Sequence, residues 1–266
     1  MPSSSHRPRK RFGQHFLHDP RVLEKIIDAL SLQPSDRVVE IGPGEGALTH
    51  LLLKQTCNVE AIEIDRDLAA RLREQFTSAH LVLHEADALA FDLRSLGGDL
   101  RIVGNLPYNI SSPLLFRIAD VADTVRDVHV MLQREVVARM TAAPATPDYG
   151  RLTVMLQATF RVERLFLVPP GAFRPVPKVE SAVARLVPLR EQAARIADKA
   201  LFARIVAGAF MQRRKTLRNA LSHLTDEATL ISAGIDPQAR GETLAVSDFV
   251  RLTDAVKARA AASQDR

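Results

Sequence analysis

The sequence has little of several features on which common protein classes depend. Its 266 residues contain one cysteine, Cys57, which excludes a disulfide framework and a cysteine-based metal site and fits a reducing compartment. No apolar run approaches the roughly 20 residues needed to cross a bilayer, and the basic N-terminus lacks the apolar core of a secretion signal. We therefore expect a cytoplasmic protein without a membrane segment or a metal.

The composition indicates a folded, basic protein. Hydrophobic residues make up 46% of the chain and charged residues 25%, so a fibre or a disordered chain is excluded. Lys and Arg number 36 against 31 Asp and Glu, an excess that suits a polyanionic partner but is weak evidence until its distribution is known. The length allows one large α/β domain and a smaller appendage.

Short β-rich runs alternate with helical patterns over the first half of the chain. This alternation predicts a parallel sheet covered on both faces, with the last strands returning antiparallel at one edge. Ligands then bind at the carboxyl ends of the strands. The strands are expected at 37–41, 58–64, 80–87, 100–103 and 127–133.

A glycine-rich turn and an acid together predict a cofactor-binding site. Gly42-Pro43-Gly44-Glu45-Gly46 follows the first of these strands and precedes the helical segment 47–54, so a ligand can approach the backbone. The spacing is a weak signal alone, because it is not the full G-x-G-x-x-G fingerprint. Glu63 lies about 20 residues further on, where an acid accepts hydrogen bonds from ribose hydroxyls. Asp65 either shares that role or caps the next helix.

The segment 103–110, Val-Gly-Asn-Leu-Pro-Tyr-Asn-Ile, predicts a strand that runs into a rigid loop. Pro107 holds its surroundings extended, so the Asn105 amide and nearby carbonyls form a stationary row of acceptors beside the ring of Tyr108. Such a pocket suits a planar base with an exocyclic amine, for example an adenine turned out of a nucleic acid. An ordinary Asn-x-Pro turn with a core tyrosine would show the same pattern.

After Pro188 the pattern changes to helices only. The spacing of apolar residues predicts one helix over 199–221, and its second half carries four cations within six positions and no intervening acid. A run of charges is usually a solvated face, but this density suggests contacts with phosphates.

Residues 105–113, Asn-Leu-Pro-Tyr-Asn-Ile-Ser-Ser-Pro, resemble the signature of the adenine dimethyltransferases of small-subunit ribosomal RNA, the KsgA/RsmA group. The likeness extends from Arg11 to about Leu252. It implies a Rossmann-like S-adenosylmethionine-dependent methyltransferase fold with a small all-α C-terminal domain. The implied domains are a basic arm over the cofactor site at 1–18, a catalytic domain at 19–189 and a helical RNA-binding domain at 190–266.

The resemblance and the motifs together assign roles to individual residues. Phe173, in the Pro-rich segment 169–178, is expected to form the second wall of the adenine slot, and many relatives carry Asn in place of His15. The expected catalytic residues are Asn105, Leu106, Pro107, Tyr108 and Phe173. The expected contacts of S-adenosylmethionine are His15, Leu17, Gly42, Gly44, Glu63, Asp87 and Asn105. The expected RNA contacts are Arg213, Arg214, Lys215 and Arg218.

The implied reaction is dimethylation of the exocyclic amines of two adjacent adenines near the 3′ end of small-subunit ribosomal RNA. We expect a monomer that acts on the pre-small ribosomal subunit. One alternative is a methyltransferase of the large subunit, of the kind that confers macrolide resistance. Another is a ribosome-assembly factor whose catalysis is secondary. A nicotinamide oxidoreductase is disfavoured, because no catalytic His, Lys or Tyr constellation accompanies the glycine turn.

Overall fold

The structure, a computed structural model, describes residues 14–56, 58–77, 79–191, 196–212 and 214–264. The chain divides into two compact units. Unit 1 comprises 1–137 and 162–188, and unit 2 comprises 138–161 and 189–266. Residues 1–13 of the expected basic arm at 1–18 lie outside the described residues. No helix in the described part of the chain is both long and apolar enough to cross a membrane.

Unit 1 is built on a seven-stranded sheet of order β4-β3-β2-β5-β6-β9-β7. The four pairs from β4 to β6 are parallel, and β9 returns antiparallel beside β6. The predicted α/β class and the antiparallel return are therefore confirmed. The strands are β2 (Arg37–Ile41), β3 (Asn58–Glu63), β4 (Leu81–Glu85), β5 (Leu100–Asn105), β6 (Val125–Gln133), β7 (Phe160–Val168) and β9 (Ser181–Pro188).

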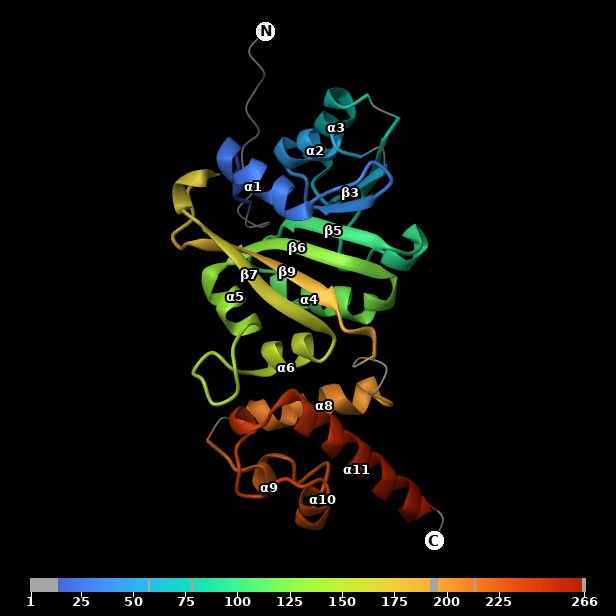
Figure 1. Cartoon of the computed structure of the whole chain (residues 1–266), viewed down its shortest axis with the longest axis vertical. Helices are drawn as coiled ribbons and strands as arrows, with labels where there is room; N and C mark the ends of the chain where they lie inside the picture. Colours follow the sequence, from blue (N-terminus) through green and yellow to red (C-terminus); the bar gives the residue numbers. More distant parts are fainter. Residues whose placement is uncertain (1–13, 57, 78, 192–195, 213, 265–266) are drawn as a thin grey trace. The chain divides into compact units, whose positions relative to one another are not determined.

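The central strands form where they do because both of their faces are buried. Four of the five residues of β2 and five of the six residues of β5 are buried, as expected for a sheet covered on both sides. Figure 1 shows α1, α2 and α3 on one side of the sheet and α4 on the other. These helices are α1 (Pro20–Leu30), α2 (Ala47–Leu52), α3 (Arg66–Gln75) and α4 (Ser111–Asp120).

Short polar signals set the ends of the helices. The Asp19 side chain accepts hydrogen bonds from the N–H groups of Arg21 and Val22 at the start of α1, and Ser31 ends this helix in the left-handed conformation. Asp65 caps α3 by accepting from the N–H of Asp67. The capping interpretation of Asp65 is thus the correct one.

Unit 2 is helical and has its own core around Phe202, Phe249 and Tyr149. The Tyr149 hydroxyl donates to the Leu244 carbonyl at 2.7 Å. The segment 138–161 belongs to this unit, whereas the sequence assigned it to the catalytic domain. Helix α5 (Arg134–Met140) leads into it. The helices that follow are α6 (Arg151–Gln157), α8 (Lys199–Met211), α9 (Leu217–Ala220), α10 (Glu227–Ser232) and α11 (Val246–Gln264).

The predicted single helix over 199–221 is wrong. Helix α8 ends at Met211, and α9 starts only at Leu217. The N–H of Leu217 donates to the Ala239 carbonyl at 2.8 Å, and the N–H of Arg218 donates to the Pro237 carbonyl at 3.1 Å. These bonds replace the intrahelical bonds that a continuous helix would need, so the cations Arg214 and Lys215 lie in the connection between two helices.

Candidate active site

The glycine turn lies between β2 and α2 and has the backbone that only glycine adopts readily. Gly42, Gly44 and Gly46 have φ values of 69°, 59° and 82°. A Cβ at Gly44 would come within 2.9 Å of the Phe16 ring. The N–H groups of all three glycines donate within the chain, so the turn offers a ligand a close approach to its backbone rather than free glycine donors.

Glu63, the last residue of β3, is held beside this turn by two backbone donors. One carboxylate oxygen accepts from the Gly44 N–H at 3.1 Å, and the other accepts from the Asp65 N–H at 2.9 Å. The side chain is buried, and this burial raises its pKa, although the two backbone bonds oppose the shift. Each oxygen keeps a further lone pair, so Glu63 can still accept hydrogen bonds from a ligand.

The loop after β5 presents oxygen acceptors in a fixed frame. The Asn105 amide nitrogen donates to the His15 carbonyl at 2.7 Å, so the amide oxygen is left for another partner. The Leu106 N–H donates to the Met131 carbonyl at 3.1 Å. Among the described residues, none donates to the Leu106 carbonyl oxygen. Two acceptors at the end of one strand are thus available to an amine.

Tyr108 forms an aromatic wall of the same site. Its hydroxyl lies 2.7 Å from the Ser181 hydroxyl, and burial raises its pKa. The His15 ring stacks on the Tyr108 ring at a centroid distance of 5.5 Å and an interplanar angle of 27°. His15 Nδ1 lies 2.7 Å from the Pro175 carbonyl oxygen. The His15 side chain is therefore part of the site, a role that the sequence left in doubt.

These residues surround one pocket of about 900 Å³, a volume that includes space open to solvent. Its lining includes Ile64, an apolar side chain that is 45% exposed at the end of β3 and suits the face of a planar ring. The Glu63 carboxylate and the apolar walls fit a nucleoside. Nine of the predicted residues line this pocket: His15, Gly42, Gly44, Glu63, Asp87, Asn105, Leu106, Pro107 and Tyr108.

Asp87, an expected cofactor contact, lines the same pocket. It follows β4, its side chain accepts from the Leu89 N–H at 2.9 Å, and it is exposed toward the pocket that Glu63 also lines. An exposed carboxylate at this edge can accept a hydrogen bond from an exocyclic amino group.

Two predicted residues lie elsewhere. Phe173 is fully buried in the core of unit 1, outside the pocket lining, because β8 (Phe173–Arg174) pairs with β1 (Phe16–Leu17) and turns the ring inward. Leu17 is buried in the same core and does not line this pocket. As placed here, Phe173 is not the second wall of the slot, and the His15 ring is the one that faces Tyr108.

Some residues of the site were missed by sequence reasoning. Phe16 lies between the predicted contacts His15 and Leu17 in the sequence. It lines this pocket, whereas Leu17 does not. A Cβ at Gly104 would come within 2.4 Å of the Ile41 carbonyl oxygen. This glycine therefore lets the end of β5 approach the glycine turn closely. The glycine immediately before Asn105 was the available signal.

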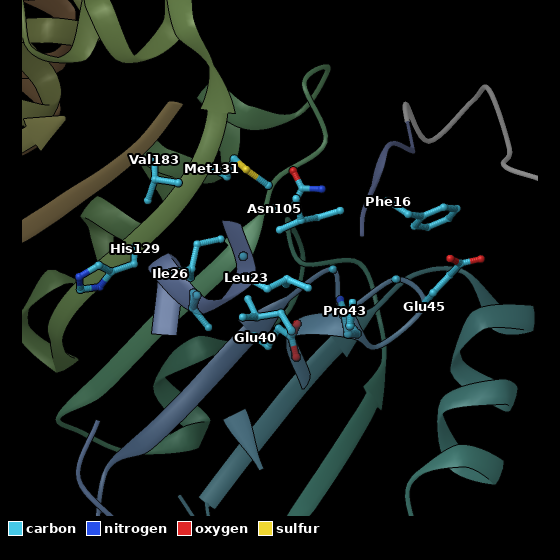
Figure 2. A pocket seen from close by; sticks show the side chains of 17 residues that line it. Phe16, Leu23, Ile26, Glu40, Pro43, Glu45, Asn105, His129, Met131 and Val183 are labelled. Atoms are coloured by element: carbon cyan, nitrogen blue, oxygen red, sulfur yellow. The ribbon is translucent and has the colours of Figure 1, made fainter. Parts of the chain in front are cut away.

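A second cavity of about 540 Å³ lies behind the glycine turn and shares Phe16, Gly42, Gly44 and Asn105 with the first. Figure 2 shows Phe16 and His129 at opposite ends of it. Burial lowers the pKa of His129 to about 4, so the ring is neutral at pH 7. Glu40 also lines this cavity and accepts from the Thr49 hydroxyl at 2.6 Å.

Glu40 predicts a pH dependence of stability. Burial raises its pKa to about 7, with the nearby Glu63 acting in the same direction and the Thr49 bond against it. Between about pH 4.5 and pH 7 the folded chain holds a proton that the unfolded chain has released, so this group lowers the free energy of unfolding as pH rises. Glu40→Gln should remove this contribution, on the order of a few kcal/mol. Urea unfolding of the wild type and of Glu40→Gln at about pH 5 and about pH 8 checks this prediction. If the free energy of unfolding falls equally in both proteins between the two pH values, the prediction is wrong.

The cations of unit 2 are only partly described. Arg214, Lys215 and Arg218 are exposed, and Arg213 lies outside the described residues. Arg218 pairs with Glu227 at 3.3 Å. The structure therefore places the described cations on a surface without showing what they bind.

Comparison with known proteins agrees with this geometry. Residues 5–258 match the family described as ribosomal RNA adenine dimethylase. The ribosomal RNA small subunit methyltransferase A of Aromatoleum aromaticum is 56% identical over 96% of this chain and 97% of its own. That of Thiobacillus denitrificans is 56% identical over 93% of this chain and 97% of its own.

Two solved structures are similar over most of the chain. A dimethyladenosine transferase from Plasmodium falciparum has a TM-score of 0.79 and 26% identity, covering 90% of this chain and 96% of its own. The 23S rRNA methyltransferase ErmE has a TM-score of 0.68 and 29% identity, covering 91% and 99%. The fold is that of Rossmann-like S-adenosylmethionine-dependent methyltransferases. With a family match that spans the acceptor loop, the glycine turn and both units, the chain belongs to the ribosomal RNA adenine dimethylase family.

Proposed function

We propose that this enzyme transfers methyl groups from S-adenosylmethionine to the exocyclic amines of two adjacent adenines near the 3′ end of small-subunit ribosomal RNA. The observation that carries the proposal is the pair of free acceptors, the Asn105 amide oxygen and the Leu106 carbonyl, beside a pocket that suits the cofactor. The name of the relatives that share more than half of this sequence supports the small subunit as the target.

The cofactor supplies an electrophilic methyl group on a sulfonium. Glu63 would bind the ribose hydroxyls, and Asp87 would bind the amino group of the cofactor's adenine. Gly42 and Gly44, which line the same pocket, would let the cofactor lie directly against the backbone of the turn. These contacts would set the direction from which the target amine must approach.

The residues of the acceptor loop would make the target amine reactive. The lone pair of adenine's amine is delocalised into the ring, so the amine is a poor nucleophile. When Asn105 and the Leu106 carbonyl accept its two hydrogens, they favour a pyramidal nitrogen whose lone pair points at the methyl group. No strong base is needed, because the proton leaves only after the new N–C bond has formed. Alignment of this kind is worth roughly 7 to 11 kcal/mol.

The second transfer would use the same groups. The singly methylated amine keeps one hydrogen, so one of the two acceptors is enough to orient it. The new methyl group then takes the place of the lost hydrogen near the other acceptor. A site with two acceptors can therefore orient the amine in both transfers.

For RNA binding we propose a contribution from the basic stretch of unit 2, Arg213, Arg214, Lys215 and Arg218. The described members are exposed, as phosphate contacts require, although Arg218 would have to leave Glu227. We also propose that the protein acts as a cytoplasmic monomer on the pre-small ribosomal subunit. The competing hypothesis is methylation of the large subunit, because the 23S rRNA methyltransferase ErmE is 29% identical to this chain.

One experiment tests the proposal directly. Radioactive methyl incorporation is measured into small subunits that lack the modification, into large subunits and into bare ribosomal RNA. Transfer to small-subunit RNA, with two modified adjacent adenines in the digested product, is the expected result. Incorporation confined to large subunits would replace this proposal with the competing one.

The Tyr108 ring should matter more than its hydroxyl. Tyr108→Ala removes the aromatic wall and should weaken capture of the target base by roughly 1 to 3 kcal/mol. Tyr108→Phe keeps the ring and its stack on His15 but loses the 2.7 Å contact with Ser181, so its effect should be smaller. Steady-state kinetics with unmethylated subunits check the pair, and equal losses in the two variants would assign the role to the hydroxyl.

A further inference from the structure

The segment between β7 and β9 carries two exposed cations, Arg174 and Lys178, that form no ion pair with any residue the structure describes. The one acid in residues 169–180 is Glu180, and it pairs with Arg134 at 2.7 Å. Two positive charges of this segment therefore remain uncompensated. We call residues 174–179 the rim.

Contacts before and after Lys178 connect the rim to Tyr108, in the loop that follows β5. The Pro175 carbonyl oxygen lies 2.7 Å from Nδ1 of His15, whose ring stacks on Tyr108. Just after the rim, the Ser181 hydroxyl lies 2.7 Å from the Tyr108 hydroxyl. All these residues belong to unit 1. The cations of the rim thus stand at a set position beside the ring that would stack on the target base.

The rim also exposes one apolar side chain between its two cations and one directly after them. Val176 is 62% exposed and Val179 is 45% exposed. Alternating cations and apolar side chains are typical of surfaces that bind single-stranded nucleic acid, where phosphates meet Lys or Arg and sugars or bases lie on apolar groups. A purely solvated loop would not require the two valines to face outward.

We propose that the rim binds the RNA backbone next to the target adenine, with Arg174 and Lys178 on the phosphates that flank the base turned into the slot. A base taken out of its strand leaves its own phosphates at the mouth of the pocket, and the rim contacts this pocket's wall through Pro175 and His15. This inference rests on the proposed function, because it assumes that the target base is part of an RNA. It assigns to unit 1 a contact that is separate from the basic stretch of unit 2.

The test compares two double variants that each remove two positive charges from unit 1. Arg174→Gln with Lys178→Gln alters the rim. Arg73→Gln with Arg94→Gln is the matched control, because these half-exposed arginines already pair with Glu85 and Asp123. Affinity for bare small-subunit RNA and for unmethylated small subunits is titrated at several salt concentrations. Thermal melts and S-adenosylmethionine affinity establish that each variant is folded.

The rim variant should lower the slope of log affinity against log salt by roughly 1.4 to 1.8 units, for two lost phosphate contacts. The control should leave the slope unchanged, and both should bind the cofactor as the wild type does. An unchanged slope in the rim variant, or an equal loss in the control, would overturn the inference. So would a loss for subunits but not for bare RNA, which would indicate a ribosomal protein as the partner. Wild-type enzyme that methylates no small-subunit RNA would instead refute the proposed function.

Discussion

Asn105→Ala should lower kcat for methyl transfer by about 100- to 1,000-fold, the loss typical of one preorganised hydrogen-bonding group at a reacting centre. The amide oxygen is set for the substrate because the amide nitrogen is already committed to the His15 carbonyl at 2.7 Å. S-adenosylmethionine affinity should stay within a few-fold, since Gly44 and Glu63 are unchanged. Single-turnover transfer and calorimetric titration of the cofactor measure the two effects separately.

Two further variants control this experiment. Asn105→Asp cannot donate to the His15 carbonyl, so two acceptors would face each other and the orientation of the side chain would be lost. It should be nearly as inactive as the alanine variant. Asn58→Ala removes an exposed amide at the start of β3, outside both cavities, and should transfer methyl groups normally. Near wild-type turnover by Asn105→Ala would place the reacting amine elsewhere.

The same variant separates catalysis from a role in subunit assembly. A chain with Asn105→Ala should still bind the unmethylated subunit, because the cations on its surface are intact. If it restores normal maturation of small subunits in cells that lack the enzyme, binding matters more than methylation there. If maturation fails as it does without the protein, the chemistry is required.

Glu63→Ala should reduce S-adenosylmethionine affinity severely. Each hydrogen bond from a ribose hydroxyl to the charged acceptor is worth about 1.5 to 3 kcal/mol, so each lost bond should cost roughly a factor of 10 to 100. Glu63→Gln should also bind poorly, for a reason specific to this structure. Both carboxylate oxygens accept a backbone N–H, from Gly44 and Asp65, so an amide nitrogen would face a donor on one side.

The matched control for Glu63 lies on the same strand. Glu60 pairs with His84 at 2.7 Å and lines neither cavity, so Glu60→Gln should leave cofactor affinity unchanged. Calorimetry of the three variants, with thermal melts to verify folding, decides the matter. Unchanged affinity in Glu63→Ala would remove this acid from the cofactor site.

Much of the site was predictable because parallel strands place their carboxyl ends at one edge of a sheet. Gly44, Glu63 and Asn105 each follow or end a strand with a clear apolar pattern, and all three line the same pocket. Asp87 follows β4 and joins them. The spacing along the chain was sufficient here, since the alternation of strands and helices can be recognised in the local sequence pattern.

The predicted single helix over 199–221 was wrong because contacts between residues distant in the sequence determine where the helix ends. Apolar residues keep a helical spacing from Leu201 to Leu221, yet the helix breaks because Leu217 and Arg218 donate to carbonyls at Ala239 and Pro237. No local pattern contains those acceptors. The chain therefore leaves the helix to satisfy backbone groups across about 20 residues.

By itself, the sequence determined the α/β class, the strand ends at Glu63 and Asp87, and the loop after β5. Only the tertiary structure decided which aromatic ring faces Tyr108. The pairing of β1 with β8 buries Phe173 and brings His15 onto the tyrosine, although the two are far apart in the chain. It also decided that residues 138–161 belong to the helical unit. Apolar side chains are alike to a sequence pattern, and only their packing partners determine which surface each one covers.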